Sequence, residues 1–389
     1  MSGLSGQVAF VGAAETPVGA LPDQSPLELC AEAALAAIED AGLSRADVDG
    51  VVSCNAMAQP LLYPAEALAE YLQIFPRFCV GIGAGGGSTF SVLQNAAAAI
   101  ITGIADTILV AMADSLRTGL SRSQAMLVQS STGHPQFEQP YGAPVPGYYA
   151  LIAQAHMHEF GTTSEQLASI AVAARAHASA NPRAQKRDPI TVDDVMRSRP
   201  IADPLKLLDC SLVSDGGAAV IMTSAERARD LARPPVYLLG AGEGHSHEHI
   251  SAARSLTTSA AREAGERAYE MAGVGPEEMD FAQLYDCFTP TVLVELEDLG
   301  FCAKGEGGPY AESGALLPGG SLPVNTHGGL LSHSHSGNPG SMFALTESIW
   351  QLRHSAGARQ VADANLGIVH AQGGIMSSHT AVILGREAA

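Results

Sequence analysis

The chain has 389 residues, of which 46% are apolar and 16% are charged, and its formal net charge is −19. This length and composition predict a well-packed α/β protein of two or three domains rather than a disordered chain. The negative charge argues against a nucleic-acid surface or an anionic membrane surface, although it does not exclude a local basic pocket.

The cysteines and the amino-terminal segment indicate where the protein works. The six cysteines form no CxxC pair and no regular framework, so we expect reduced thiols in a cytosolic protein. The first basic residue is Arg45, which argues against a positively charged signal-peptide start. Because no apolar run approaches membrane-spanning length, we expect a soluble cytoplasmic protein.

Short apolar segments alternate with helical patterns in the first third of the chain. We expect a helix between Ser25, its N-cap, and Gly42, with Pro26 in the first helical position. Buried strands are expected at 7–12, 47–53 and 106–113. Together with a second helix that precedes the last of these strands, the order is βαβαβ, which predicts parallel strands joined by crossover helices.

Five glycines lie among residues 81–87, directly before that second helix. Ser88 is the expected N-cap of the helix, which should end near Gly103. A glycine-rich turn at a helix start exposes backbone N–H groups and the positive end of the helix dipole, which suits an anion. Because neither GxGxxG nor Walker spacing is present, the stretch by itself is interpreted as a tight turn.

The composition changes at Ser115. Residues 115–148 are rich in Ser, Gly, Pro, Gln and Tyr without sustained periodicity, which predicts a long loop that covers a functional site. Helices at 149–160 and 163–180 follow, and then come an irregular stretch at 200–210, a strand at 218–222 and a short helix at 224–231.

From Val236 onward the chain repeats its first pattern. Residues 236–243 resemble 8–15, and a helix followed by a strand recurs at 261–284, as it occurs at 31–52. A glycine-led helix recurs after Gly337, and late strands are expected at 366–369 and 380–384. Three similarities in the same order indicate an internal duplication. We therefore expect an N-terminal half at 1–232, with a loop domain at about 115–200, and a C-terminal half at 233–389.

Three polar clusters lie in the second half. The segment Tyr-Asp-Cys-Phe at 285–288 joins a strand to a helix, and ligands bind at such strand ends in open α/β folds. The loop at 325–337 carries three histidines, and the strand at 368–371 enters a glycine turn that could direct N–H groups at an oxygen. His333 and His335 could belong to a metal site, but no acidic or Cys ligand stands at useful spacing, so we expect no metal there. Asp286 is interpreted as a turn and helix-cap group, and Cys287 as a small buried apolar residue.

In this order the segments resemble the thiolase superfamily, and most closely its sterol-carrier-protein-like and lipid-transfer-protein-like branch. The resemblance covers essentially the whole chain, and its motifs are Val-Gly-Ala-Ala-Glu-Thr-Pro at 11–17, Asp-Gly-Gly-Ala-Ala at 215–219, Tyr-Asp-Cys-Phe at 285–288, Asn-Thr-His-Gly-Gly at 325–329 and the final Gly373-Gly374. It implies an α/β thiolase fold, with duplicated halves in a five-layer αβαβα core and a loop domain over an acyl-CoA site. It also implies a homodimer.

The chain departs from the thiolase pattern at two catalytic positions. The nucleophilic Cys of the family falls on Gly86, and its last-loop Cys falls on Ala371. Cys79 lies seven residues before Gly86, and we do not expect it to substitute. The family's catalytic His in Gly-His-Pro falls on His335, and the His of the branch's His-Asp-Cys-Phe falls on Tyr285.

These departures select among reactions. Acyl transfer needs a nucleophile that accepts the acyl group, whereas retro-aldol cleavage of a 3-hydroxyacyl-CoA needs only a base, an acid and an oxyanion hole. We therefore expect a carbon–carbon lyase, an aldolase acting without a covalent acyl-enzyme. The resemblance implies that its substrate carries a bulky lipid or steroid side chain. The candidate residues are Tyr285, His335 and His327 for catalysis, with Gly86, Gly373, Gly374 and Asn325 for the oxyanion hole and thioester.

The resemblance also bears on partners and alternatives. Branch members that lack the Cys resemble steroid side-chain aldolases, which work with a small OB-fold and zinc-ribbon partner. In that group we would expect a Tyr near position 335, so the His found there leaves the identity of the base open. No permanently bound cofactor is expected, and coenzyme A enters only as part of the substrate. An acyltransferase of thiolase type and a non-catalytic subunit of a complex remain as alternatives.

Overall fold

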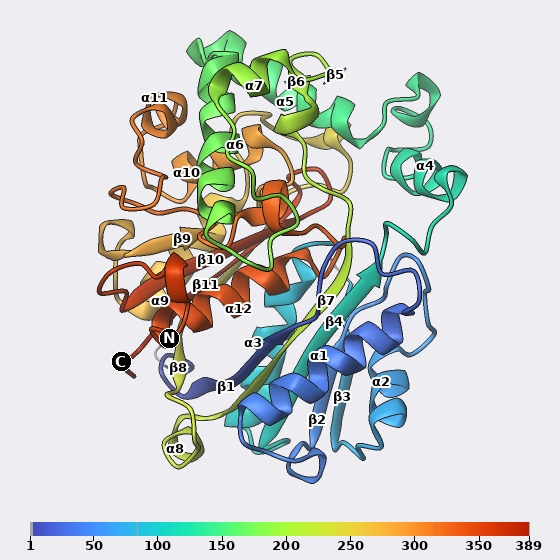
Figure 1. Cartoon of the computed structure of the whole chain (residues 1–389), viewed down its shortest axis with the longest axis vertical. Helices are drawn as coiled ribbons and strands as arrows, with labels where there is room; N and C mark the ends of the chain where they lie inside the picture. Colours follow the sequence, from blue (N-terminus) through green and yellow to red (C-terminus); the bar gives the residue numbers. More distant parts are fainter. Residues whose placement is uncertain (1–2, 84, 389) are drawn as a thin grey trace.

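Nine strands of the computed structural model form one mixed sheet in the order β3-β2-β4-β7-β1-β8-β11-β10-β9 (Figure 1). The structure describes residues 3–83 and 85–388. The strands of the first half are β1 (Val8–Glu15), β2 (Gly50–Ser53), β3 (Phe78–Gly81), β4 (Thr107–Ser115) and β7 (Asp215–Ser224). Those of the second half are β8 (Val236–His245), β9 (Phe281–Gln283), β10 (Leu366–Gly373) and β11 (Ser378–Gly385), while β5 (Pro200–Ala202) and β6 (Leu205–Lys206) pair separately.

Strand pairing in the first half differs from the expectation, although β1, β2 and β4 run in the same direction. Among the labelled strands of the described residues, β2 with β3, β2 with β4, and β9 with β10 are the parallel pairs. The prediction of parallel pairing throughout the first half is wrong for β1, which pairs antiparallel with β7 and, through Ala9 and Phe10, with β8. The cause is the long excursion after β4, because it returns the chain as β7 between β4 and β1.

The sheet has two halves, β3-β2-β4-β7-β1 and β8-β11-β10-β9, and helices lie in three layers around them. On the outer faces, α1 (Pro26–Asp40) packs on β1, β4 and β7, and α9 (Ala261–Ala272) packs on β8 and β11. Between them, α3 (Ser88–Ile101) and α12 (Gly340–Leu352) contact strands of both halves. Every residue of α12 except Trp350 is buried, as a central helix requires. The αβαβα layering of the expected thiolase fold is confirmed.

The remaining helices flank the core or cover one end of it. They are α2 (Pro64–Leu72), α4 (Arg122–Ser130), α5 (Val145–Phe160), α6 (Ser164–Ser179), α7 (Val192–Arg197), α8 (Ala225–Ala228), α10 (Thr289–Asp298) and α11 (Gly307–Glu312). The segment that carries α4 extends away from the other elements in Figure 1. The sequence did not predict α4 because it buries none of its residues and so lacks an apolar stripe.

The sequence predicts Ser25 and Ser88 as helix N-caps, and the structure confirms the first of them. Ser25 forms the expected capping box, because its hydroxyl accepts from Glu28 N and the Glu28 carboxylate accepts from Ser25 N. The prediction for Ser88 is wrong, since Gly87 is the N-cap of α3 and the Ser88 hydroxyl donates to the Gly85 carbonyl at 2.7 Å. The helix does end near Gly103, whose φ is +72°. Among the described helices, none combines the length and apolar character that crossing a membrane demands.

Candidate active site

Tyr285 lies between β9 and α10 and is held by the helix that follows it. Its N–H donates to the carboxylate of Glu295 at 3.0 Å, and its carbonyl accepts from the Thr291 hydroxyl at 2.8 Å. The side chain is buried, and its Oη lies 3.4 Å from Nε2 of His335. Burial raises the pKa of Tyr285 well above 10, so the phenol is neutral at pH 7.

His335 follows a short π-helical turn, Gly329–His333, and is fixed by two serines that precede β7. The Ser214 hydroxyl accepts from the His335 N–H at 3.2 Å, and Ser211 Oγ lies 3.1 Å from His335 Nδ1. Burial lowers the pKa of His335 to about 4, so the imidazole is neutral at pH 7. When Nδ1–H donates to Ser211, the Nε2 lone pair faces the Tyr285 hydroxyl. The pair is therefore arranged to pass a proton between phenol and imidazole.

Gly86 lies directly against the phenol of Tyr285. A Cβ built on Gly86 would lie 2.5 Å from Tyr285 Oη and 2.7 Å from its Cζ, and it would also collide with the Gln372 carbonyl. No side chain therefore fits at Gly86 while Tyr285 keeps its position. The phenol occupies the space into which a side chain at residue 86 would project.

The two glycine turns of the expected oxyanion hole contact each other. A Cβ on Gly85 would lie 3.0 Å from Gly373 Cα and 3.1 Å from Gly374 N, so the backbones touch. Their carbonyls are held by hydroxyl donors, namely Ser341 at 2.9 Å for Gly86, Ser377 at 2.8 Å for Gly373 and Tyr149 at 3.1 Å for Gly374. The structure thus gathers Gly86, Gly373 and Gly374 beside the Tyr285–His335 pair.

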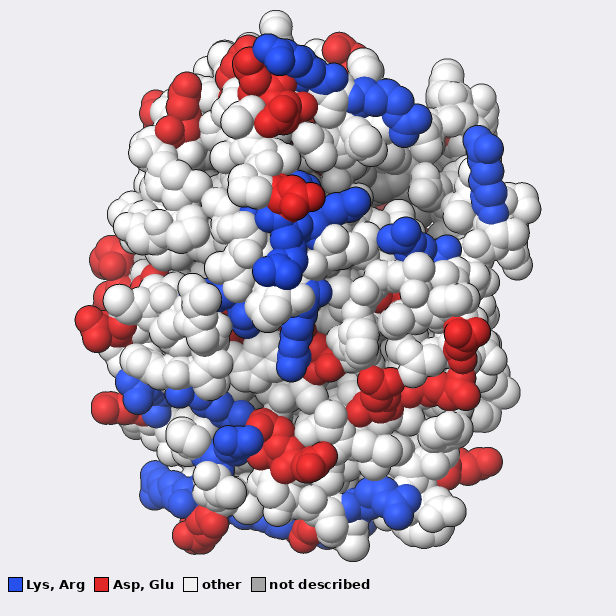
Figure 2. Space-filling model, in the orientation of Figure 1, with Lys and Arg blue, Asp and Glu red and all other residues white. Residues whose placement is uncertain are grey.

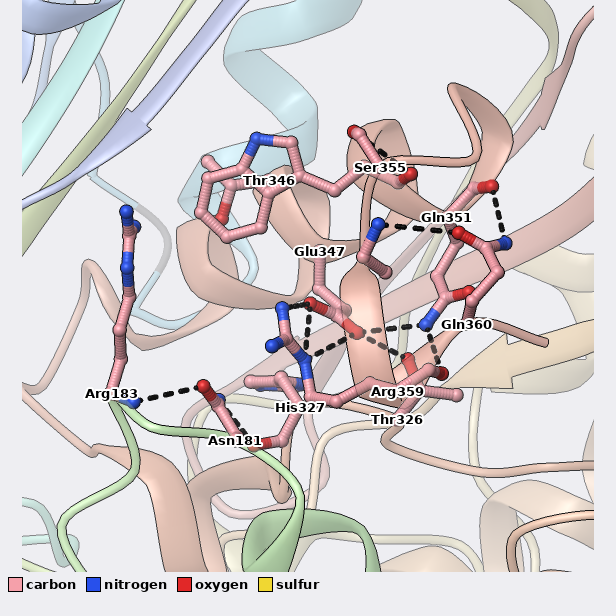
Figure 3. A network of polar contacts seen from close by, with 12 residues as sticks. Asn181, Arg183, Thr326, His327, Thr346, Glu347, Gln351, Ser355, Arg359 and Gln360 are labelled. Atoms are coloured by element: carbon pink, nitrogen blue, oxygen red, sulfur yellow. Dashed lines mark hydrogen bonds and ion pairs between the residues drawn. The ribbon is translucent and has the colours of Figure 1, made fainter.

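The other two candidate residues make their contacts elsewhere. Asn325 Oδ1 accepts from Leu284 N at 2.8 Å, so its carboxamide fixes the end of β9. His327 is buried with its ring centroid 5.2 Å from that of His333. It lies beside the network in Figure 3, in which Glu347 pairs with Arg359 at 2.8 Å. Neither ring nitrogen of His327 has a hydrogen-bond partner among the described residues, and its backbone carbonyl accepts from Asn181 at 2.9 Å. No contact links the ring to Tyr285 among those residues.

Two family models match the chain, "Thiolase, N-terminal domain" at residues 8–226 and "Thiolase C-terminal domain-like" at residues 242–386. The chain belongs to the thiolase family.

Relatives within the thiolase family include both lyases and transferases. A 17-hydroxy-3-oxo-4-pregnene-20-carboxyl-CoA lyase of Mycobacterium tuberculosis is 38% identical over 90% of this chain and 92% of its own. An acetyl-CoA acetyltransferase of Methanothermobacter thermautotrophicus is 35% identical over 94% of this chain and 96% of its own. The solved structure of an Ltp2-ChsH2(DUF35) aldolase superposes with a TM-score of 0.87, at 35% identity and 98% coverage of both chains. The likeness to the lyase and the aldolase agrees with the suspected branch.

Several residues that contact this thiolase site were not singled out from the sequence. Gln372 donates to Tyr149 Oη at 2.7 Å and to Cys287 Sγ at 3.2 Å, while Tyr149 stacks on Phe288 with centroids 4.4 Å apart. Gln372 stands next to the Gly373-Gly374 motif, which could have drawn attention to it. Ser211 belongs to a stretch without periodicity, so no sequence signal points to it.

Asp286 and Cys287 have the roles of supporting residues. The Asp286 carboxylate accepts from the N–H groups of Leu330 and Leu331 at 2.7 and 3.2 Å, so it holds the π-helical turn before His335. The expectation that Asp286 caps a helix is wrong for α10, whose N-cap is Phe288 without a side-chain bond. Cys287 is buried as expected, and burial raises the pKa of its thiol, which disfavours a thiolate.

One cleft lies away from the Tyr285–His335 pair. It has a volume of about 540 Å³ and lies between the ends of α1 and α12. All four arginines that line it are paired with carboxylates. Arg353 and Arg233 pair with Asp40 at 2.8 and 3.0 Å, Arg359 pairs with Glu347 at 2.8 Å, and Arg183 pairs with Glu15 at 3.8 Å. Figure 2 shows Lys and Arg side chains gathered across the middle of one face of this acidic chain. The negative net charge therefore does not prevent a local cationic surface.

Proposed function

We propose that this thiolase-family chain cleaves a bulky 3-hydroxyacyl-CoA by a retro-aldol reaction, without a covalent acyl-enzyme. The observation that supports it most directly is the Tyr285 phenol, which lies against Gly86 and 3.4 Å from His335 Nε2. The products are a ketone or aldehyde and a shortened acyl-CoA.

In the proposed proton transfers, the Tyr285 phenol and the His335 imidazole are both neutral at the start. The substrate hydroxyl gives its proton to Tyr285 Oη as the phenol proton passes to His335 Nε2. The electron pair of that O–H bond forms the new carbonyl, the carbon–carbon bond breaks, and its pair becomes a thioester enolate. The negative enolate nearby raises the pKa of His335 from its resting value of about 4, which stabilises the imidazolium. The phenol and imidazolium then return the proton to the α-carbon.

The backbone supplies the electrostatic part of the proposal. An enolate oxygen placed between the turns at Gly86 and at Gly373-Gly374 could accept their N–H groups, in the manner of an oxyanion hole. The hydroxyl donors on the carbonyls of these glycines support this placement, because they fix both turns before the substrate arrives. Removal of one preorganised donor of this kind from an enzyme raises the activation free energy by about 2.7–4 kcal/mol.

The names of the relatives support the substrate class. In the name of the mycobacterial lyase, the hydroxyl stands at C17 and the carboxyl-CoA at C20, so the hydroxyl is β to the thioester. That is the arrangement a retro-aldol cleavage needs. We also propose a homodimer and a small partner protein, the latter because the aldolase structure includes ChsH2(DUF35) in its title.

Acyl transfer is the second candidate, and the 35% identity to an acetyl-CoA acetyltransferase favours it. Because residue 86 is glycine, acyl transfer would need a cysteine thiol elsewhere in the chain. Burial raises the pKa of Cys79 on β3 to about 11, and that of Cys287 still further. Both thiols are therefore poor nucleophiles at pH 7.

The proposal is tested by following the products from bulky 3-hydroxyacyl-CoA substrates by mass spectrometry. Tyr285→Phe keeps the ring and removes the hydroxyl, and His335→Gln removes the proton acceptor. We expect each to lower kcat by about 10²- to 10⁴-fold. The controls Tyr71→Phe and His158→Gln change exposed residues and should retain full activity. Unchanged activity in both site variants would indicate a silent subunit whose partner carries the catalysis.

A further inference from the structure

A second cluster of titratable side chains lies where α10 packs near β10 and β11. Glu295 comes from α10, His370 from β10 and His379 from β11, and all three side chains are buried. Each offers one ligand atom, and these atoms lie within 4.8 Å of one another. The proposed mechanism uses none of the three.

The polar atoms of this cluster are incompletely satisfied. His370 Nε2 lies 3.1 Å from His379 Nδ1, and His370 Nδ1 lies 3.5 Å from the Glu295 carboxylate. Three buried atoms have no hydrogen-bond partner among the described residues, namely Glu295 Oε1, His370 Nδ1 and His379 Nε2. Unsatisfied buried groups gathered at one place call for a bound species, because native structures contain few of them.

We propose that Glu295, His370 and His379 bind a divalent transition-metal ion of the zinc class. Two imidazoles and a carboxylate are donors that zinc accepts, and neutral imidazole is the form that ligates. Burial raises the pKa of Glu295 well above its usual range, and within the described residues no Lys or Arg pairs with it. A bound cation would displace the carboxyl proton and stabilise the carboxylate.

The three donors are close enough for one ion to bind them after small movements of the side chains, because one ligand atom of each residue lies within 4.8 Å of the others. Bonds of about 2.0–2.1 Å at tetrahedral angles place neighbouring donors about 3.4 Å apart. The 3.1 Å separation between His370 Nε2 and His379 Nδ1 is close to that value. The 3.5 Å contact with Glu295 involves the other nitrogen of His370, so one ion would use only one of these two contacts. Rotation of the Glu295 carboxyl about its broad terminal torsion and small shifts of the rings bring one atom of each residue onto the ion.

The ion would connect the core to the active site. It would join α10, β10 and β11 at one point, and Glu295 also accepts the N–H of Tyr285 at 3.0 Å. Bound metal would therefore position the Tyr285 backbone without contacting substrate. Because the donors are fully buried, we expect the metal to enter as the chain folds and to raise the melting temperature.

The test is the metal content of the full-length protein, purified without a chelating tag from zinc-supplemented cells. We expect about one zinc per chain in the wild type, and at least tenfold less in His379→Gln and Glu295→Gln. His245 and His249 lie in a neighbouring His-rich segment that could bind zinc adventitiously, so His245→Gln/His249→Gln is the matched control and should keep the metal.

A second measurement covers variants that fail to fold. Wild-type protein is refolded with zinc, with cobalt, or with a chelator alone. We expect a higher melting temperature with zinc and the visible absorption bands of tetrahedral cobalt. A metal-free wild type whose melting temperature is unaffected by zinc would overturn the proposal and assign the cluster to a buried water. Loss of zinc from His245→Gln/His249→Gln, with zinc retained in His379→Gln and Glu295→Gln, would also overturn the proposal.

Discussion

The contact between Gly86 and Tyr285 predicts that residue 86 tolerates no side chain. In Gly86→Ala the added Cβ would lie 2.5 Å from Tyr285 Oη and 2.7 Å from Cζ, and it would press on the Gln372 carbonyl. Overpacking of this kind costs about 1–3 kcal/mol. Gly83→Ala is the matched control, because a Cβ at Gly83 meets nothing within 4 Å. We expect urea unfolding to show the loss in the first variant and almost none in the second.

The double variant Gly86→Ala/Tyr285→Ala tests whether Tyr285 is the neighbour that excludes a side chain at residue 86. Tyr285→Ala removes two of the three contacts, so Gly86→Ala should cost less in that background, with a coupling energy of about 1 kcal/mol. Gly83→Ala should be additive with Tyr285→Ala. Equal costs for Gly86→Ala in both backgrounds would refute the assignment of the space to the phenol. Gly86→Cys should likewise fail to gain acyl transfer while Tyr285 is present.

Three further predictions concern the support of the site. His335 is a base with its pKa lowered to about 4, so it stays neutral down to that pH, and the acid limb of kcat/KM should lie near pH 4 rather than 6.5. A limb at 6.5 in the free enzyme would contradict the burial argument. Ser211→Ala removes the partner of His335 Nδ1, so kcat should fall about two- to tenfold with little change in unfolding free energy. Burial raises the pKa of Asp286 to about 7 from 3.8, so the native state retains a proton that the unfolded chain loses. Stability should therefore decline as pH rises from about 4 to 7 in urea titrations, and Asp286→Asn should lack this slope.

The sequence predicts the layers of this fold better than its strand order. The similarity of 8–15 to 236–243 reflects two equivalent buried strands, β1 and β8, so the duplication could be recognised from local pattern. The placement of β7 between β4 and β1 could not, because it depends on where a 99-residue excursion returns and not on periodicity.

In the candidate site, too, local motifs could be read from the sequence, whereas contacts between distant segments could not. Tyr285, His335 and the glycine turns could be proposed as site residues because they stand in motifs with a fixed order. The contact of Tyr285 with Gly86 joins residues 199 positions apart and follows only from packing. The grouping of Glu295, His370 and His379 could not be predicted for the same reason, since their spacing in the chain matches no ligand motif.

The central claim is cleavage without an acyl-enzyme, and the mass of the intact protein during turnover tests it most directly. The protein is incubated with a bulky 3-hydroxyacyl-CoA, together with the small partner if one is required, while products are measured in parallel. We predict an unmodified protein, a carbonyl product and a shortened acyl-CoA. An acyl adduct on a cysteine of this chain that forms and decays at the rate of turnover would contradict the account.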